Sequence, residues 1–137
     1  MTHSYRSLEI ERTAQVATIW MNRPAVHNAF DELLIAELGA ACAALDADAS
    51  VRVVVLGGRG RHFSAGADLH WMQRAAQRSH AENVQDARQF AAMLQGLATL
   101  RKPTVARVQG LALGGGTGLA AACDLALAAD DACFATS

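Results

Sequence analysis

The sequence of 137 residues has few of the residues from which several common sites are built. No two of its three cysteines (Cys42, Cys123 and Cys133) have the spacing Cys-x-x-Cys, which excludes the thiol pairs of zinc and redox sites. None of its five histidines lies four positions from another, which excludes the helical zinc pair of metalloproteases. We therefore expect a reduced protein with no metal site.

Strong charge of either sign and long apolar runs are also lacking. Lys and Arg total 12, Asp and Glu total 13, and the formal net charge is -1, so we expect no nucleic-acid or anionic-membrane partner. No apolar run approaches the roughly 18 residues of a membrane span. Residues 1–12 contain no apolar core of the kind found in secretory leaders, so we expect a cytoplasmic protein. Hydrophobic residues make up 52% of the chain, which excludes disorder.

The residue pattern predicts an α/β fold. Alternation over 7–12 and 16–22 predicts a β-hairpin, and apolar residues at helical spacing predict a helix over 31–46. The nearly continuous apolar stretch 51–58 is typical of a strand covered on both faces. Further along the chain, the pattern predicts helices near 69 and over 81–100, a strand over 105–108, a helix after three glycines, and a strand over 124–130.

The three glycines, Gly114 to Gly116, follow a strand and precede a helix. The usual phosphate-binding patterns do not fit them: a dinucleotide fingerprint needs glycine at Leu119, and Gly-Lys-Ser/Thr occurs nowhere. The Gly-x-Ser-x-Gly turn of hydrolases fails as well, because His62 stands two residues before Ser64. The glycines serve either close packing of helix on strand, or exposure of backbone N–H groups at a helix start, where negative charge is favoured.

A second loop, residues 62–69, has the same organisation: a strand, then small residues, then a helix start. Ser64 to Ala67 leave the backbone uncovered, and Asp68 stands where it could cap the next helix, a role we prefer to that of a base. Two such loops could direct N–H groups into one cleft, as an oxyanion hole requires.

The stretches NRPAVHNAF (22–30), FSAGADL (63–69) and VQGLALGGGTGLAAACDLALAADDACFA (108–135) carry a resemblance. In order and spacing the chain resembles the enoyl-CoA hydratase/isomerase (crotonase) family, and most of all methylglutaconyl-CoA hydratase-like members. The resemblance implies a crotonase-like spiral of ββα units, an acyl-CoA thioester substrate with no separate cofactor, and assembly as a homotrimer or hexamer.

The resemblance also implies which residues form the site. The backbone N–H groups of Ala67 and Gly115 would hold the thioester oxygen as it becomes an enolate. Ala25 replaces a basic residue that the family often has, so Arg23 is either its substitute at a phosphate or a solvated loop residue. Trp71 and Met72 line either the acyl pocket or the core. Contacts to the coenzyme A thioester fall on Val26, Ala29, Ala65, Gly66, Asp68, Leu69, Gly114 and Gly118.

One departure from the family pattern concerns the acid and base. Family hydratases use two glutamates, and the position of the first is Gly118 here, while the second would fall after Ser137. We therefore expect residues 1–137 to be the N-terminal part of a single truncated crotonase-like domain, inactive alone, and the full-length protein to hydrate a branched or carboxylated 2-enoyl-CoA. The alternatives are a double-bond isomerase, a non-catalytic acyl-CoA-binding remnant and, with less support, a nucleotide-binding domain.

Overall fold

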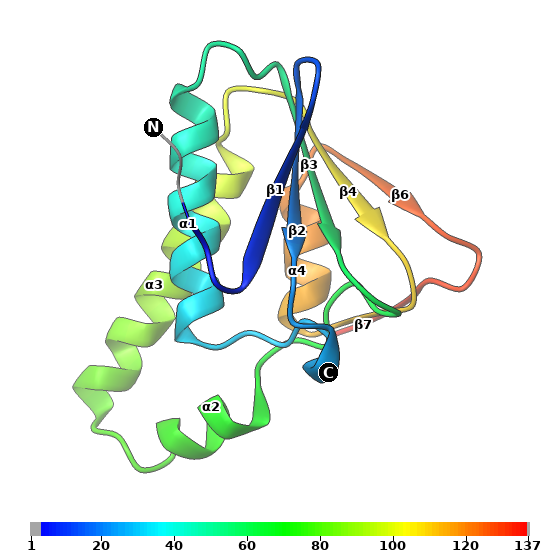
Figure 1. The fold of residues 1–137 in the computed structure, drawn as a ribbon. Helices are drawn as coiled ribbons and strands as arrows, with labels where there is room; N and C mark the ends of the chain where they lie inside the picture. The colour runs from blue at the N-terminus through cyan, green and yellow to red at the C-terminus, as the bar shows by residue number, and fades with distance from the viewer. Residues whose placement is uncertain (1–3, 137) are drawn as a thin grey trace.

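The computed structural model describes residues 4–136, and its main sheet has five strands. β1 (Leu8–Thr13) and β2 (Val16–Met21) form the predicted antiparallel hairpin. β3 (Val53–Gly58), β4 (Thr104–Val108) and β6 (Leu125–Ala128) add parallel to β2, in the order β1-β2-β3-β4-β6 (Figure 1). The α/β class and the parallel strands follow the prediction.

In the described part of the chain, four α-helices and one short 3-10 helix connect the strands. α1 (Glu32–Ala47) begins after Asp31, whose carboxylate accepts a hydrogen bond from the Leu34 N–H. α3 (His80–Ala98) begins with a capping box between Ser79 and Glu82. No helix within 4–136 is long and apolar enough to cross a membrane. The remaining helices are η1 (Pro24–Val26), α2 (Leu69–Ala75) and α4 (Gly115–Ala122).

The core lies on one face of the sheet, between the strands and α1 and α3 (Figure 1). Val54 and Leu56 of β3 point into it, whereas Val53 and Val55 are half-buried on the opposite face. The prediction that strand 51–58 is covered on both faces is therefore wrong for the described residues, because both long helices pack on the same side. Leu125 and Leu127 of β6 are exposed.

The glycine stretch differs from the prediction in where the helix starts. α4 begins at Gly115, so that Gly114, at φ 51°, is the residue before the helix. A three-residue strand, β5 (Leu111–Leu113), precedes it and pairs in parallel with β7 (Cys133–Ala135). Gly116 packs so closely on the next loop that a Cβ there would lie 2.5 Å from the Ser64 carbonyl oxygen. Close packing is thus one role of the glycines.

Candidate functional site

Two loops that follow neighbouring strands run side by side. The Phe30 N–H donates to the Gly66 carbonyl at 2.7 Å, and the Asp68 N–H donates to the Phe30 carbonyl at 2.7 Å. The Ser64 hydroxyl donates to the Asn28 carbonyl at 2.9 Å and accepts from the Gly66 N–H at 3.2 Å. Because three of these four bonds run between the two segments, they fix the path of residues 64–68 against residues 28–30.

Asn28 is fully buried and ties three segments to this loop. Its Oδ1 accepts from the Arg23 N–H at 2.8 Å, and its Nδ2 donates to the carbonyls of Arg59 and His62 at 2.9 Å each. Its φ of 55° is left-handed, a conformation that asparagine adopts more readily than most residues. Sequence reasoning missed this role, because the partners are distant along the chain.

Asp68 caps α2, as predicted. Its Oδ1 accepts from the Trp71 N–H at 3.1 Å, and its Oδ2 lies 3.3 Å from Arg23 Nη2. Burial raises the pKa of Asp68, but the bonds from the Trp71 and His70 N–H groups and the Arg23 charge outweigh it, so the net pKa is lowered. Arg23 also lies 3.4 Å from Asp31 and donates to the Ala29 carbonyl. Its side chain is 22% exposed and contacts two carboxylates, so Arg23 is not a solvated loop residue.

Ala67 and Gly115 line one cavity of about 380 Å³. That these two residues share a site agrees with the prediction. Within the described residues, neither backbone N–H donates a hydrogen bond to another protein group. Gly115 is the first residue of α4, whose start has no side-chain cap. The cavity is lined by Phe30, Ala67, Trp71, Met72, Ala75, Asn83, Asp86, Ala87, Phe90 and Gly115.

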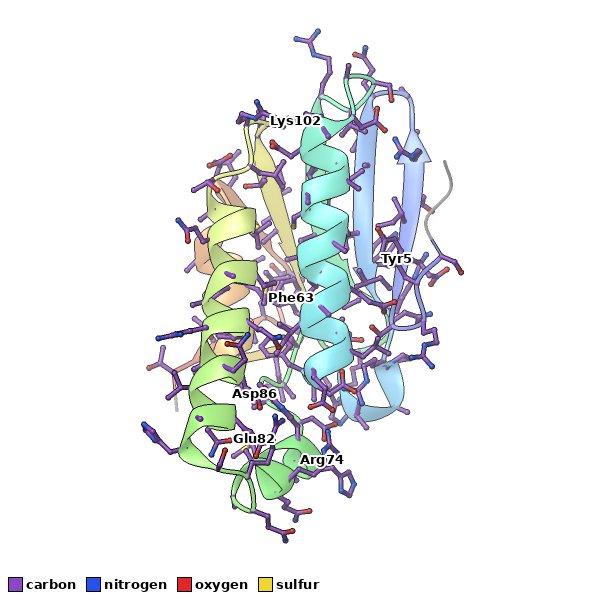
Figure 2. All side chains as sticks on the ribbon, turned by 90° about the vertical axis from the view of Figure 1, so that its left-hand side faces the viewer. Tyr5, Phe63, Arg74, Glu82, Asp86 and Lys102 are labelled. Atoms are coloured by element: carbon purple, nitrogen blue, oxygen red, sulfur yellow. The ribbon has the colours of Figure 1, made fainter. Side chains whose placement is uncertain are left out.

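The cavity walls are mainly apolar and come from α2 and α3. The rings of Phe30 and Phe90 lie 5.6 Å apart between centroids, and Trp71 and Met72 line the same cavity. Trp71 also packs against the core, whereas Met72 is exposed. Asp86 is the single charged residue of the lining, and its carboxylate lies 2.9 Å from Arg78. Figure 2 shows Asp86 on the part of α3 that lies nearest α2. The sequence analysis missed the α3 residues.

A signal for them was present in the sequence. Asn83, Asp86, Ala87 and Phe90 recur at the i, i+3, i+4, i+7 spacing of one helix face. This face was missed because a polar residue and an acidic residue interrupt its apolar character.

The other predicted site residues do not line this cavity. Val26 and Leu69 are exposed, whereas Ala29 and Gly66 are buried. The Ala65 N–H donates to the His27 carbonyl at 2.9 Å, which brings Ala65 beside the Val26–Ala29 segment. The Gly114 N–H donates to the Ala135 carbonyl at 2.8 Å.

Gly118 lies one turn into α4, where an added Cβ would meet nothing within 4 Å. Residues 4–136 also contain no group of three or more His, Cys, Asp or Glu placed to bind a metal ion.

Known proteins resemble the chain along nearly its whole length. The family model described as Enoyl-CoA hydratase/isomerase matches residues 11–137. A 2,3-dehydroadipyl-CoA hydratase of Escherichia coli is 38% identical over 93% of this chain and 48% of its own length. A 4-chlorobenzoyl coenzyme A dehalogenase-2 of Arthrobacter is 39% identical over 97% of this chain and 49% of its own.

Solved structures give the same result. An enoyl-CoA hydratase from Shewanella pealeana superposes with a TM-score of 0.92 at 35% identity, over 94% of this chain and 49% of that one. The crotonase fold is thereby confirmed. The chain spans about half the length of the curated relatives it matches.

Proposed function

Because the chain belongs to the enoyl-CoA hydratase/isomerase family, we propose that the protein binds an acyl-CoA thioester and holds its carbonyl oxygen between the N–H groups of Ala67 and Gly115. The observation that carries this proposal is that two N–H groups without protein acceptors line one mainly apolar cavity. An apolar site strengthens hydrogen bonds to an oxygen that gains negative charge, and the start of α4 adds its dipole. Losing one such donor costs about 3 kcal/mol of transition-state stabilisation.

The proposed reaction is the hydration of a 2-enoyl-CoA. The oxygen of water adds to C3, the carbonyl oxygen carries the enolate charge, and a proton then reaches C2. This chain stabilises the charge through Ala67 and Gly115. It offers no side chain at Gly118 to accept or deliver the proton, so we propose that residues 1–137 alone bind the thioester without turnover.

The cavity also bears on the acyl group. Its volume of about 380 Å³ is small for a ligand pocket, which suits an acyl chain rather than the nucleotide. The one carboxylate of the lining, Asp86, is paired with Arg78 at 2.9 Å, and no lining residue is a cation that could pair with a carboxylate on that chain. Of the branched and the carboxylated acyl groups expected from the sequence, we propose the branched, uncharged one.

Coenzyme A would lie outside the cavity, along the backbone of Val26, Ala29, Ala65 and Leu69. The exposure of Val26 and Leu69 supports this placement. A cytoplasmic trimer or hexamer remains part of the proposal, and the mass of the purified protein in solution tests the assembly.

Two substitutions at one position test the oxyanion proposal in the protein expressed from its complete gene. Gly115→Pro removes the N–H, and Gly115→Ala keeps it; both introduce a Cβ that would lie 2.5 Å from the Phe30 ring. Proline is tolerated at the first position of a helix. We expect enoyl-thioester absorbance to disappear roughly 100-fold more slowly with proline than with alanine. Equal rates for the two variants would contradict the proposal.

The same assay separates the alternatives. If butyryl-CoA binds but the absorbance of a 2-enoyl-CoA does not decrease, a non-catalytic acyl-CoA-binding protein is favoured. The lack of a side chain at Gly118 supports this alternative. Movement of the double bond without addition of water would favour an isomerase.

A further inference from the structure

We infer that Arg23 is a positioning residue whose charge acts through two peptide groups and makes the Ala67 N–H a stronger donor to the thioester oxygen. The inference rests on the proposed function, since it takes the Ala67 N–H to hold that oxygen. It goes further by assigning a role in the reaction to a side chain that does not line the cavity.

The two peptide groups belong to one series of hydrogen bonds. Arg23 Nη1 donates to the Ala29 carbonyl, whose peptide group also contains the Phe30 N–H. The Phe30 N–H donates at 2.7 Å to the Gly66 carbonyl, whose peptide group contains the Ala67 N–H. A trans peptide group directs its N–H away from its C=O, and no peptide bond among the described residues is cis. The Ala67 N–H therefore points away from the Phe30 backbone, and it has no acceptor in the part of the chain that the structure describes.

A positive charge at one end of such a series strengthens every donor along it. A guanidinium group polarises the carbonyl that accepts its bond, the N–H of the same peptide group becomes a stronger donor, and the effect passes on at about 10–30% per bond. The Ala67 N–H is the last donor of the series. Because the thioester oxygen gains negative charge in the transition state, a stronger donor there stabilises the transition state more than the substrate.

Two carboxylates hold the guanidinium of Arg23 in this position. Its Nη2 lies 3.4 Å from Asp31 Oδ2 and 3.3 Å from Asp68 Oδ2, which leaves Nη1 for the Ala29 carbonyl. Each carboxylate also accepts a backbone N–H at the start of a helix, α1 or α2, where the helix dipole balances part of its negative charge. The carboxylates thus orient the guanidinium without fully cancelling its charge.

The Gly115 N–H has no such series behind it. The Gly114 carbonyl of the same peptide group accepts from the Gly118 N–H at 3.3 Å, at the start of α4. The sequence of this helix, GGTGLAAA, contains no charged residue. Arg23 should therefore affect only one of the two N–H groups, and the other serves as an internal reference.

The test follows amide proton resonances by NMR while the protein expressed from its complete gene is saturated with butyryl-CoA. We expect the Phe30 resonance to move downfield together with that of Ala67, although the Phe30 N–H is bonded to Gly66 and not to the ligand. The Asp68 N–H, which donates to the Phe30 carbonyl outside the series, should not move. If the Ala67 and Gly115 resonances move and that of Phe30 does not, the inference is overturned and the proposed function stands. If neither Ala67 nor Gly115 responds, both fail.

Variants of Arg23 assign the effect to its charge, because Arg23→Gln removes the charge and Arg23→Lys keeps it. In Arg23→Gln we expect the downfield shift of Ala67 to be smaller by about 10–30% and that of Gly115 to be unchanged, whereas Arg23→Lys should retain both. An unreduced Ala67 shift in Arg23→Gln, or an equal reduction at both N–H groups, would contradict the inference. If Arg23→Gln does not fold, the Phe30 resonance of the unsubstituted protein decides.

Hydration of crotonyl-CoA by the same protein gives a second readout. We expect Arg23→Gln to lower kcat about 2- to 4-fold, a fraction of the roughly 100-fold effect of a whole donor, and to leave KM nearly unchanged. Arg74→Gln is the matched control: it removes the exposed ion pair between Arg74 of α2 and Glu32 of α1, and it should change neither constant. A raised KM at constant kcat in Arg23→Gln would contradict the inference.

Discussion

The two loops that bring Ala67 and Gly115 to one cavity are held in different ways. Residues 64–68 are fixed by polar side chains: Ser64 and Asp68 bond to backbone N–H groups, and Asn28 anchors the segment alongside. Residues 114–116 are fixed by close contact. A Cβ on Gly116 would lie 2.5 Å from the Ser64 carbonyl oxygen. Gly66, at φ 89°, is also closely packed, since a Cβ there would lie 2.8 Å from the Leu113 carbonyl oxygen. The position of an N–H near a helix start thus depends on side-chain hydrogen bonds together with close packing in one loop, and on close packing of glycines in the other.

This comparison predicts different responses to substitution. A single methyl group added at Gly116 should destabilise the close-packed loop strongly, because the neighbouring atom is the Ser64 backbone carbonyl, which cannot move aside. The hydrogen-bonded loop should weaken in proportion to the polar groups left without partners.

The largest effect is expected for Gly116→Ala, whose methyl group would overlap the Ser64 carbonyl. We expect a loss of about 3 kcal/mol in the free energy of unfolding, at the upper end for overpacking. Chemical denaturation measures it. Gly118→Ala in the same helix is the control: nothing lies within 4 Å of its Cβ, and we expect a gain of about 0.5–1 kcal/mol. Similar stabilities for the two variants would show that close packing does not fix this loop.

Asn28→Ala comes next, because it removes three hydrogen bonds at a fully buried position. The carbonyls of Arg59 and His62 and the N–H of Arg23 would lose their partner, which should lower the free energy of unfolding by about 2–3 kcal/mol. Asn22→Ala, at an exposed position, should change it by less than about 0.5 kcal/mol. A loss below about 1 kcal/mol for Asn28→Ala would break the proposed distinction between the loops.

The smallest effect concerns His62, which joins the two regions: its Nδ1 accepts from the Leu111 N–H at 3.0 Å. Burial, then the charges of His27 and Arg61, lower the pKa of His62. The unfolded chain therefore binds the proton more readily, and the free energy of unfolding should fall as the pH drops below about 6.5.

His62→Asn keeps a side-chain acceptor and does not titrate, so it should flatten this decrease in denaturation experiments between about pH 7 and 5. His70→Gln, at an exposed position, serves as the control and should leave the decrease unchanged. An equally steep decrease in His62→Asn would show that His62 does not cause the loss of stability at lower pH.

Local patterns in the sequence predicted the elements that depend on local residues. The hairpin, α1, α2 and α3 follow from alternation, from helical spacing and, for α2, from the predicted cap Asp68. Two loops of the same organisation predicted one shared cleft, and the family resemblance placed it at Ala67 and Gly115; both residues do line one cavity.

Features that depend on distant partners could not be predicted in this way. β5 and β7 have three residues each and pair across about twenty positions. Arg23 contacts Asp31 and Asp68, and the spacing of these three residues along the chain does not indicate that they lie together. The uncovered face of the sheet was missed for the same reason, since the apolar run of β3 does not reveal on which side the helices pack.

The most direct test of the account observes the two N–H groups themselves. Amide proton resonances of Ala67 and Gly115 are followed by NMR while the protein is saturated with butyryl-CoA, and then with free coenzyme A, which has no thioester carbonyl. We predict that both resonances move downfield with butyryl-CoA and stay near their original positions with coenzyme A. If butyryl-CoA binds and neither resonance moves, or if coenzyme A alone produces the same shifts, these N–H groups do not hold the thioester oxygen.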